Sequence, residues 1–221
     1  AVAEVDGNAR FLAIGNNFLG WIARQRGDLK QARLYLQRSV DGHRALHADG
    51  DEAFARSAYG ATLMDLGEFD AARRSYARQI ELARRLHLDF TVAQVYNDLG
   101  VLEGLVGDPA KAAEYIRRAY VVLKARGETP EVVGTLINLA GAELSLGRVE
   151  NAAEFAREGL EVCERRGFGR LRGNLLSLLG SAEELLGHPQ AAERAWQRVI
   201  ALGDSAAPEP RSMAIMGASR V

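Results

Sequence analysis

The chain contains 221 residues, of which 48% are hydrophobic and 26% are charged, a composition typical of a globular protein. Its 28 basic residues nearly balance its 29 acidic residues, and the formal net charge of −1 offers no overall attraction to nucleic acid or to an anionic membrane surface. No apolar run approaches the roughly 18–20 residues that a membrane-spanning helix needs. The single cysteine, Cys163, excludes an internal disulfide and a cysteine-based zinc site. We therefore expect a cytoplasmic protein with neither nucleic-acid nor membrane partners.

Glycine marks a period of 40 residues along the chain. The repeated positions are Gly27, Gly67, Gly107, Gly147 and Gly187, each followed five residues later by Ala32, Ala72, Ala112, Ala152 or Ala192. A second set runs at the same period through Gly20, Gly60, Gly100, Ala140 and Gly180. A period of this size predicts a stack of repeated helix pairs, which presents a long binding surface and rarely carries chemistry.

In chain order, residues 1–7 are expected to end a helix of a preceding repeat, because Gly7 is equivalent to Gly127 and Gly167. We accordingly expect the chain to be part of a longer protein. Five repeats follow over residues 8–202, at about 8–48, 49–88, 89–128, 129–168 and 169–202. Residues 203–221 are rich in Pro, Ala and Ser, and are expected to form a linker and a short capping helix from residue 210.

Each repeat is predicted to contain two helices separated by the repeated glycine. Glycine ends a helix readily because it adopts the left-handed backbone conformation without a steric penalty. Asp108 is then expected to cap the following helix, with Pro109 in its first turn. At the end of the second helix, His47 and His87 are equivalent to Gly127 and Gly167.

These residues resemble the pattern of the tetratricopeptide repeat, in which a Leu-Gly step is followed by a glycine and then an alanine. The Leu-Gly step is represented by Leu19-Gly20, Tyr59-Gly60, Leu99-Gly100, Leu139-Ala140 and Leu179-Gly180. The 40-residue unit is longer than the usual 34, and resembles the repeats of kinesin light chains and of bacterial regulator sensor arms. The resemblance implies an all-α fold, a right-handed solenoid of about five antiparallel helix hairpins.

The resemblance also implies that the first helix of each pair lines a concave groove that binds a protein or peptide. Carried onto this sequence, the groove contains Asn17, Trp21, Arg24, Phe54, Ser57, Met64, Gln94, Asn97, Val101, Asn138, Asn174, Ser177 and Ser181. An asparagine side chain offers both a donor and an acceptor, so Asn97, Asn138 and Asn174 could hold the backbone of an extended peptide. In the alternative, these amides solvate the groove or bond to neighbouring helices.

Several other groups of residues admit a functional and a structural interpretation. Glu103, Glu143 and Glu183 are equivalent positions that form either an acidic line for a basic partner or ion pairs with nearby arginines. The arginines at 165, 166, 170 and 172 fit either a phosphate patch or a solvated face, and we favour the second.

His43 and His47 have a spacing that can chelate a metal, although His47 also fits a helix end, where a cation complements the helix dipole. Cys163 is expected to be a small buried residue rather than a nucleophile. The sequence contains no phosphate-binding loop, nucleophile elbow or pair of catalytic acids, so we expect no enzyme activity, no catalytic residue, no metal and no cofactor.

Three functions fit this interpretation. The first is a protein-binding or peptide-binding scaffold within a larger bacterial regulatory or signalling protein. The second is a peptide-sensing arm that controls an attached effector domain. The third is self-assembly, in which a homodimer forms through a terminal repeat. The sequence does not specify the partner.

Overall fold

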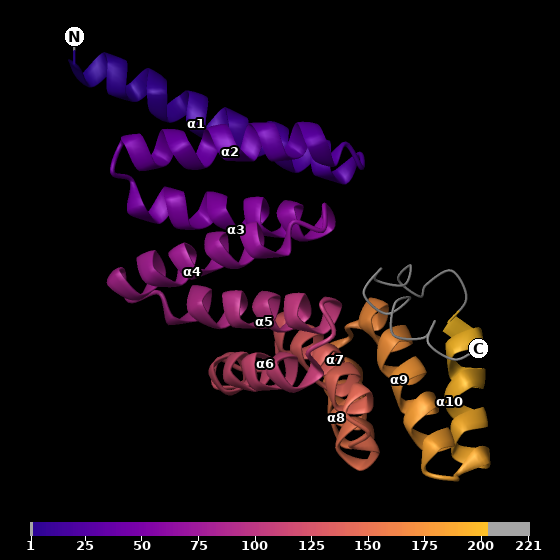
Figure 1. Cartoon of the computed structure of the whole chain (residues 1–221). Coiled ribbons are helices and arrows are strands. Elements are labelled where there is room, and N and C mark those ends of the chain that lie inside the picture. Colours follow the sequence, from indigo (N-terminus) through magenta and orange to yellow (C-terminus); the bar gives the residue numbers. More distant parts are fainter. Residues whose placement is uncertain (1, 203–221) are drawn as a thin grey trace. The chain divides into compact units, whose positions relative to one another are not determined.

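The computed structural model describes the backbone of residues 2–202 and the side chains from residue 8 onward, and this part of the chain is helical without strands. Its helices are α1 (Val2–Gln25), α2 (Leu29–Ala45), α3 (Asp49–Asp65), α4 (Phe69–Arg85), α5 (Asp89–Leu105), α6 (Pro109–Lys124), α7 (Pro130–Ser145), α8 (Val149–Arg166), α9 (Arg172–Leu185) and α10 (Pro189–Leu202) (Figure 1). A short 3₁₀ turn, Gly169–Leu171, precedes α9.

Helices adjacent in sequence pack against each other. Contacts within a pair join α1 to α2, α3 to α4, α7 to α8, and α9 to α10. Contacts between successive pairs join α2 to α3, α6 to α7, and α8 to α9. The prediction of an all-α stack of helix hairpins is therefore confirmed.

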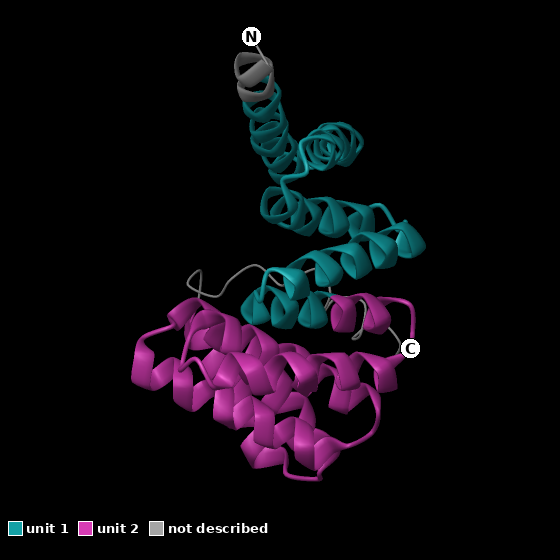
Figure 2. Ribbon diagram, turned by 90° about the vertical axis from the view of Figure 1, so that its left-hand side faces the viewer, with its two compact units in different colours: residues 1–98 teal, residues 99–221 magenta. Residues whose placement is uncertain are grey.

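The chain divides into two compact units, residues 1–98 (unit 1) and residues 99–221 (unit 2) (Figure 2). The boundary lies inside α5, in the third predicted repeat, where the sequence indicates no division. In a repeat protein each pair contacts only its neighbours, so no single core ties the whole chain together. The hydrophobic clusters are correspondingly local. One contains Ala32 and Leu36 in unit 1, and another contains Leu160, Cys163 and Leu175 in unit 2.

The repeated glycines are the helix ends that the sequence predicts. Gly27, Gly67, Gly107, Gly147 and Gly187 have φ angles between +71° and +88°. The amide of the residue after each glycine closes the turn, as where Asp108 N donates to the carbonyl of Glu103 at 2.9 Å. His47 and His87 end the second helices of their pairs with φ angles of +50° and +54°, as expected from their equivalence to Gly127 and Gly167.

The second glycine set creates close contacts between the two helices of a pair. A Cβ atom added to Gly60 would lie 2.6 Å from the ring of Tyr76, and one added to Gly100 would lie 2.3 Å from the Ile116 side chain. The repeated alanine that precedes these large residues by four positions is also buried, as at Ala72 and Ala112. Small and large residues thus interlock at each crossing, as the sequence predicts.

The first predicted element is wrong in one respect. Residues 2–25 form one helix that continues through Gly7, whereas the sequence predicts a helix end there. At Gly127 the chain can turn because Thr129 and Pro130 start a new helix two residues later. The residues after Gly7 offer no such start, and adding residues to an existing helix is easier than nucleating another. The predicted linker and capping helix at 203–221 lie outside the described residues.

Candidate functional site

The predicted groove residues all lie on the first helix of a pair. Asn17, Trp21 and Arg24 lie on α1; Phe54, Ser57 and Met64 on α3; Gln94, Asn97 and Val101 on α5; Asn138 on α7; and Asn174, Ser177 and Ser181 on α9. We call this set the first-helix stripe. The unit boundary separates the eight members up to Asn97 from the five that follow. The first eight members therefore belong to unit 1 and the last five to unit 2.

The unit 1 part of the stripe exposes two aromatic side chains. Trp21 is 52% exposed and Phe54 is 74% exposed. Asn17 and Arg24 lie one turn of helix to either side of Trp21, because residues three and four apart share a helix face. The Nδ2 atom of Asn17 is buried and has no hydrogen-bond partner. A buried donor without a partner is uncommon in folded proteins, but this atom does not reach the open surface, which here is formed by the two aromatic side chains.

A cluster of polar side chains lies beside these aromatics in unit 1. Arg24 Nε donates to Asp65 Oδ2 at 2.8 Å, so an ion pair links α1 to α3. The hydroxyl of the buried Tyr76 donates to the Met64 sulfur at 3.8 Å. Burial raises the pKa of Tyr76 well above its usual value, with further influence from Asp98, Arg24 and Asp65. These four charged or phenolic groups therefore interact with one another.

Asp98 is the most perturbed carboxyl group of this cluster. Burial raises its pKa to about 7, although a hydrogen bond from Asn97 and the charge of Arg24 act in the opposite direction. Near neutral pH this site therefore divides between a carboxylate and a neutral carboxylic acid. The sequence interpretation missed Asp65, Tyr76 and Asp98. One sequence feature could have indicated this cluster. Position 98 is an aspartate, whereas the equivalent positions of two other repeats are occupied by the apolar residues Ala58 and Leu178.

In unit 2 the stripe is more polar but less accessible. Asn138, Ser177 and Ser181 are half-buried. Asn174 is only 8% exposed, which corrects its predicted role as an open contact for a partner. It lies in the first turn of α9, directly after the 3₁₀ turn Gly169–Leu171, which packs against α7 and α9. Burial at Asn174 thus interrupts the proposed row of three asparagines, of which Asn97 belongs to unit 1 and the other two to unit 2.

The three equivalent glutamates are structural. Glu103, Glu143 and Glu183 are buried, and basic side chains lie within ion-pair distance of each. Lys111 lies 3.3 Å from Glu103, Arg117 pairs with Glu143, and both Arg157 and His188 pair with Glu183. Burial raises the pKa of Glu183, but hydrogen bonds from His188 and Arg157 outweigh it, so the pKa is lowered overall. The ion-pair alternative is confirmed over an acidic line for a partner.

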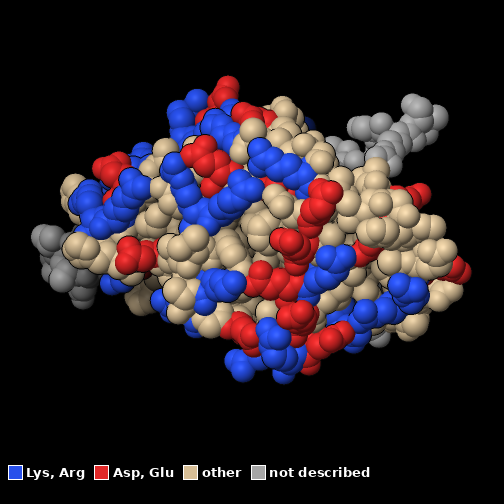
Figure 3. Space-filling view, turned by 90° about the horizontal axis from the view of Figure 1, so that it is seen from below, with Lys and Arg blue, Asp and Glu red and all other residues tan. Residues whose placement is uncertain are grey.

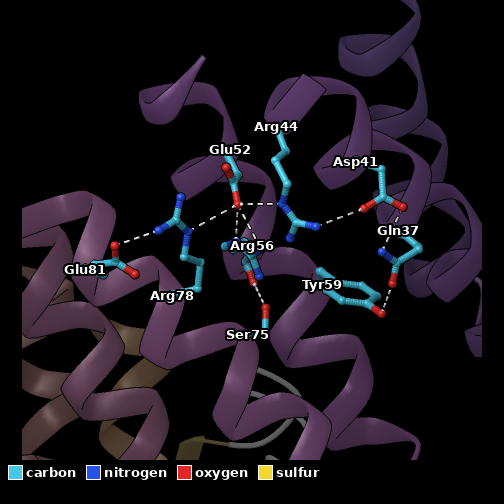
Figure 4. A network of polar contacts seen from close by, with 9 residues as sticks. All are labelled: Gln37, Asp41, Arg44, Glu52, Arg56, Tyr59, Ser75, Arg78 and Glu81. Carbon is cyan, nitrogen blue, oxygen red and sulfur yellow. Dashed lines mark hydrogen bonds and ion pairs between the residues drawn. The ribbon is translucent and has the colours of Figure 1, made fainter. Parts of the chain in front are cut away.

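A further buried carboxylate, Glu52, joins three helices of unit 1 (Figure 4). Its Oε1 atom lies 2.7 Å from Arg56, 3.5 Å from Arg44 and 3.7 Å from Arg78. Arg44 also contacts Asp41, and Arg78 also contacts Glu81 at 2.6 Å. Since each arginine already faces a carboxylate, the network holds α2, α3 and α4 together and leaves no free cationic site for an anion.

The remaining sequence candidates have structural surroundings. His43 is buried between α2 and α3, and burial lowers its pKa. In the part of the chain that the structure describes, no three potential metal-binding side chains are grouped around a common point. Cys163 is buried, as predicted, and burial raises the pKa of its thiol to about 11. A thiol with this pKa is a poor nucleophile near neutral pH.

The charges of the surface are mixed. Arg165 pairs with Glu128 at 2.7 Å and with Glu161 at 3.5 Å. Figure 3 shows basic side chains lying beside acidic ones on the face in view. None of the described helices combines the length and the apolar composition needed to cross a membrane.

Two segments of the chain match family models of a known repeat. Two family models, both described as tetratricopeptide repeat, match residues 51–125 and residues 132–166. No curated protein matches the sequence.

Solved structures share the fold at low sequence identity. BtubC (BKLC) from P. vanneervenii is 17% identical with a TM-score of 0.77, covering 96% of this chain and 84% of its own. A Podosopora anserina protein described as a kinesin light chain with nearly identical TPR-like repeats is 16% identical, with a TM-score of 0.74. That match covers 88% of this chain and 95% of the other. MamA is 20% identical with a TM-score of 0.60, covering 88% of this chain and 92% of its own.

The matched models fall on helix pairs with a 40-residue period, and these neighbours have the same stacked arrangement. The chain therefore belongs to the tetratricopeptide repeat family, in a long-repeat form that resembles kinesin light chain.

Proposed function

We propose that this chain binds an extended peptide or protein segment along the unit 1 part of the first-helix stripe. The fold itself is that of a protein-interaction scaffold, a class that is generally not enzymatic. The observation that supports this location is the pair of exposed aromatics, Trp21 and Phe54.

The chemistry of this surface defines the kind of segment it fits. Trp21 and Phe54 offer apolar area to one or two side chains of the partner, and aromatic residues supply much of the energy at protein interfaces. Asn17 and Asn97 can bond to the backbone of an extended segment, which carries both donors and acceptors. Asp98 adds a group that can accept or donate a hydrogen bond according to its protonation.

The wider setting rests on the resemblance to regulator sensor arms. A role in a bacterial regulatory protein, a peptide-sensing arm and a cytoplasmic location all remain proposals of this kind. Whether the chain acts as a scaffold or as a peptide-sensing arm, its first step would be the binding of a segment to unit 1.

A peptide library displayed on phage tests the binding surface. Peptides selected on the wild-type chain are measured by calorimetry against a Trp21→Ala/Phe54→Ala double variant. We expect a loss of affinity of at least about tenfold, because truncation of interface aromatics commonly costs 1 kcal/mol or more. Val121→Ala is the matched control, since Val121 is 69% exposed on α6, outside the stripe. Peptides that bind the double variant as tightly as the wild type would refute this location.

A further inference from the structure

The polar cluster of unit 1 carries more acidic than basic groups. The cation that acts on the Asp98 carboxyl group is Arg24, whose Nε atom already donates to Asp65 Oδ2 at 2.8 Å. One guanidinium therefore serves two carboxyl groups, and the cluster holds one negative charge in excess when both are ionised. The other groups that act on this cluster, the Asn97 amide and the Tyr76 phenol, carry no charge near neutral pH.

This excess charge lies beside the aromatic residues of the proposed binding surface. Arg24 lies one turn of helix after Trp21 on α1. On α5, Asp98 directly follows Asn97, a member of the first-helix stripe. Building on the proposed function, we infer that the segment bound in unit 1 carries a lysine or arginine side chain. That side chain contacts Asp98 and Asp65, while a neighbouring apolar side chain of the segment contacts Trp21.

The repeat architecture does not require charged groups at these positions. Forty residues further along the chain, the positions of Arg24, Asp65, Tyr76 and Asp98 are occupied by Met64, Leu105, Ile116 and Asn138. None of these four equivalents carries a charge, so the repeat pattern accepts uncharged residues throughout this set. Departures from the pattern of a fold that bring no evident gain in packing are expected at functional positions. Binding of a charged partner gives the cluster such a function.

The charges favour a basic partner over an acidic one. An acidic side chain would add a third carboxylate around a single guanidinium, and like charges repel. A lysine or arginine would instead compensate the excess charge, and its apolar stem can lie along the exposed rings of Trp21 and Phe54. Asp98 keeps some exposure to solvent, so a long side chain can approach it.

The protonation of Asp98 makes this contact depend on pH. Its pKa is about 7 in the free chain, and a cation bound beside it would lower that value. Below pH 7, binding must therefore release the proton of Asp98, so a basic segment should bind more tightly as the pH rises and reach a plateau above pH 7. Arg24 and Asp65 face the same cluster from α1 and α3, and Tyr76 faces it from α4, where burial holds its pKa well above its usual value.

Peptides selected by phage display on the 221-residue chain test the charge of the partner. We expect those that depend on Trp21 and Phe54 to contain a lysine or arginine near an apolar residue. In synthetic copies measured by calorimetry at pH 8, replacing that basic residue with glutamine should lower the affinity at least about tenfold, as for close charge pairs at other interfaces. The same replacement should have little effect on binding to Asp98→Asn, where the charge pair is already lost.

Two further variants separate this contact from general attraction and from loss of folding. Asp70→Asn removes an acid that pairs with Arg73 on the surface of α4, and should bind the peptides like the wild type. Arg24→Gln removes the competing guanidinium, and should bind the basic peptides more tightly, which an unfolded variant cannot do. Circular dichroism checks that each variant keeps its helix content.

A pH series gives a second readout. For peptides without histidine, we expect the affinity for the wild type to be about tenfold lower at pH 6 than at pH 8, because the proton of Asp98 must then be displaced. Asp98→Asn should show a much smaller change. Equal changes in the two proteins would overturn the inference.

The outcomes distinguish this inference from the proposed function on which it rests. Peptides that depend on Trp21 and Phe54 but contain no basic residue, or contain acidic residues instead, overturn the inference and leave the proposed surface in place. So do basic peptides that bind Asp98→Asn as tightly as the wild type, or that bind a folded Arg24→Gln variant more weakly. Peptides that bind the Trp21→Ala/Phe54→Ala variant undiminished refute the proposed function, and the inference with it.

Discussion

Arg117 of α6 donates a hydrogen bond to Glu143 of α7, a carboxylate that is fully buried. Arg148 lies 3.6 Å from the other oxygen of Glu143, and Asn151 donates to it at 3.4 Å. A buried carboxylate is stable only when its charge is compensated. This contact therefore makes the junction between α6 and α7 depend on a polar pair as well as on apolar packing.

Removing the arginine should weaken unit 2. We expect Arg117→Ala to lower the free energy of unfolding by about 2 kcal/mol, below the 3–5 kcal/mol typical of a broken buried pair because the arginine is partly solvated. Urea denaturation would show a lower midpoint with an unchanged slope. Arg118→Ala is the control, since Arg118 and Glu114 form a pair on the surface of α6. That substitution should cost less than about 1 kcal/mol, and equal effects of the two variants would contradict the role given to Arg117.

Replacing His87 with glycine at the end of α4 should stabilise the folded chain. His87 is exposed and has a φ angle of +54°, a conformation that costs a residue with a side chain roughly 1–2 kcal/mol. Glycine removes this conformational cost, but its greater freedom in the unfolded chain offsets part of the resulting stabilisation. We expect His87→Gly to raise the melting temperature modestly, with a stabilisation of up to about 1 kcal/mol.

The reverse change at an equivalent type of turn provides the comparison. Gly107 has a φ angle of +88°, so Gly107→Val should destabilise by about 1 kcal/mol or more. Thermal melting of the two variants beside the wild type measures both effects. Shifts in the same direction would show that backbone strain at these turns is not the governing factor.

Asp98 should make stability depend on pH. Its pKa is about 7 in the folded chain against an ordinary value of 3.8, so between these values the folded chain binds more protons at this site than the unfolded chain. The free energy of unfolding contributed by Asp98 therefore falls as pH rises, and levels off above the folded pKa. Asp98→Asn removes this dependence, and the variant should gain stability relative to the wild type as the pH rises.

Urea midpoints of both proteins across a pH series measure that difference. His43 acts in the opposite sense, because burial lowers its pKa below 6.5 and its contribution to stability is lost as pH falls. Both proteins contain His43, so the difference between their midpoints isolates Asp98. A difference that stays constant with pH would mean that Asp98 keeps an ordinary pKa.

Two glycines within helices should respond oppositely to alanine. Gly60→Ala places a methyl group 2.6 Å from the Tyr76 ring and should destabilise by about 1–3 kcal/mol through overpacking. Gly134 of α7 has open space around it, so Gly134→Ala should stabilise by up to about 1 kcal/mol through helix propensity. Chemical denaturation of the two variants gives both values. Destabilisation by Gly134→Ala would indicate a contact at that position.

The sequence predicted those features that depend on residues close together in the chain. Gly107 with Asp108 and Pro109 specifies a turn locally: the Asp108 side chain accepts from the amide of Lys111, and Pro109 lies in the first turn of α6. The burial of Cys163 and the helix-end position of His87 followed from the same 40-residue register. These are consequences of propensity and periodicity, which need no knowledge of tertiary contacts.

The candidate site was harder to predict because it depends on which side chains meet across helices. The ion pair between Arg24 and Asp65 joins residues 41 positions apart, and the sequence does not indicate which acid an arginine will contact. The pKa of Asp98 depends on burial that only the packed structure provides. Asn174 failed as an open contact for the same reason, since the turn before α9 has no counterpart in the repeat pattern.

The arginine–glutamate pairs between neighbouring helices also limit how such a protein can be rearranged. If a repeat that carries Glu143 or Glu183 were moved to follow α2, whose equivalent residue is Gln37, the glutamate would lose the arginine that pairs with it. Such a move would therefore be penalised, whereas a repeat moved together with the helix that precedes it would retain its pairing. The buried charge pairs therefore restrict which second helix can precede the fourth and fifth repeats of this chain.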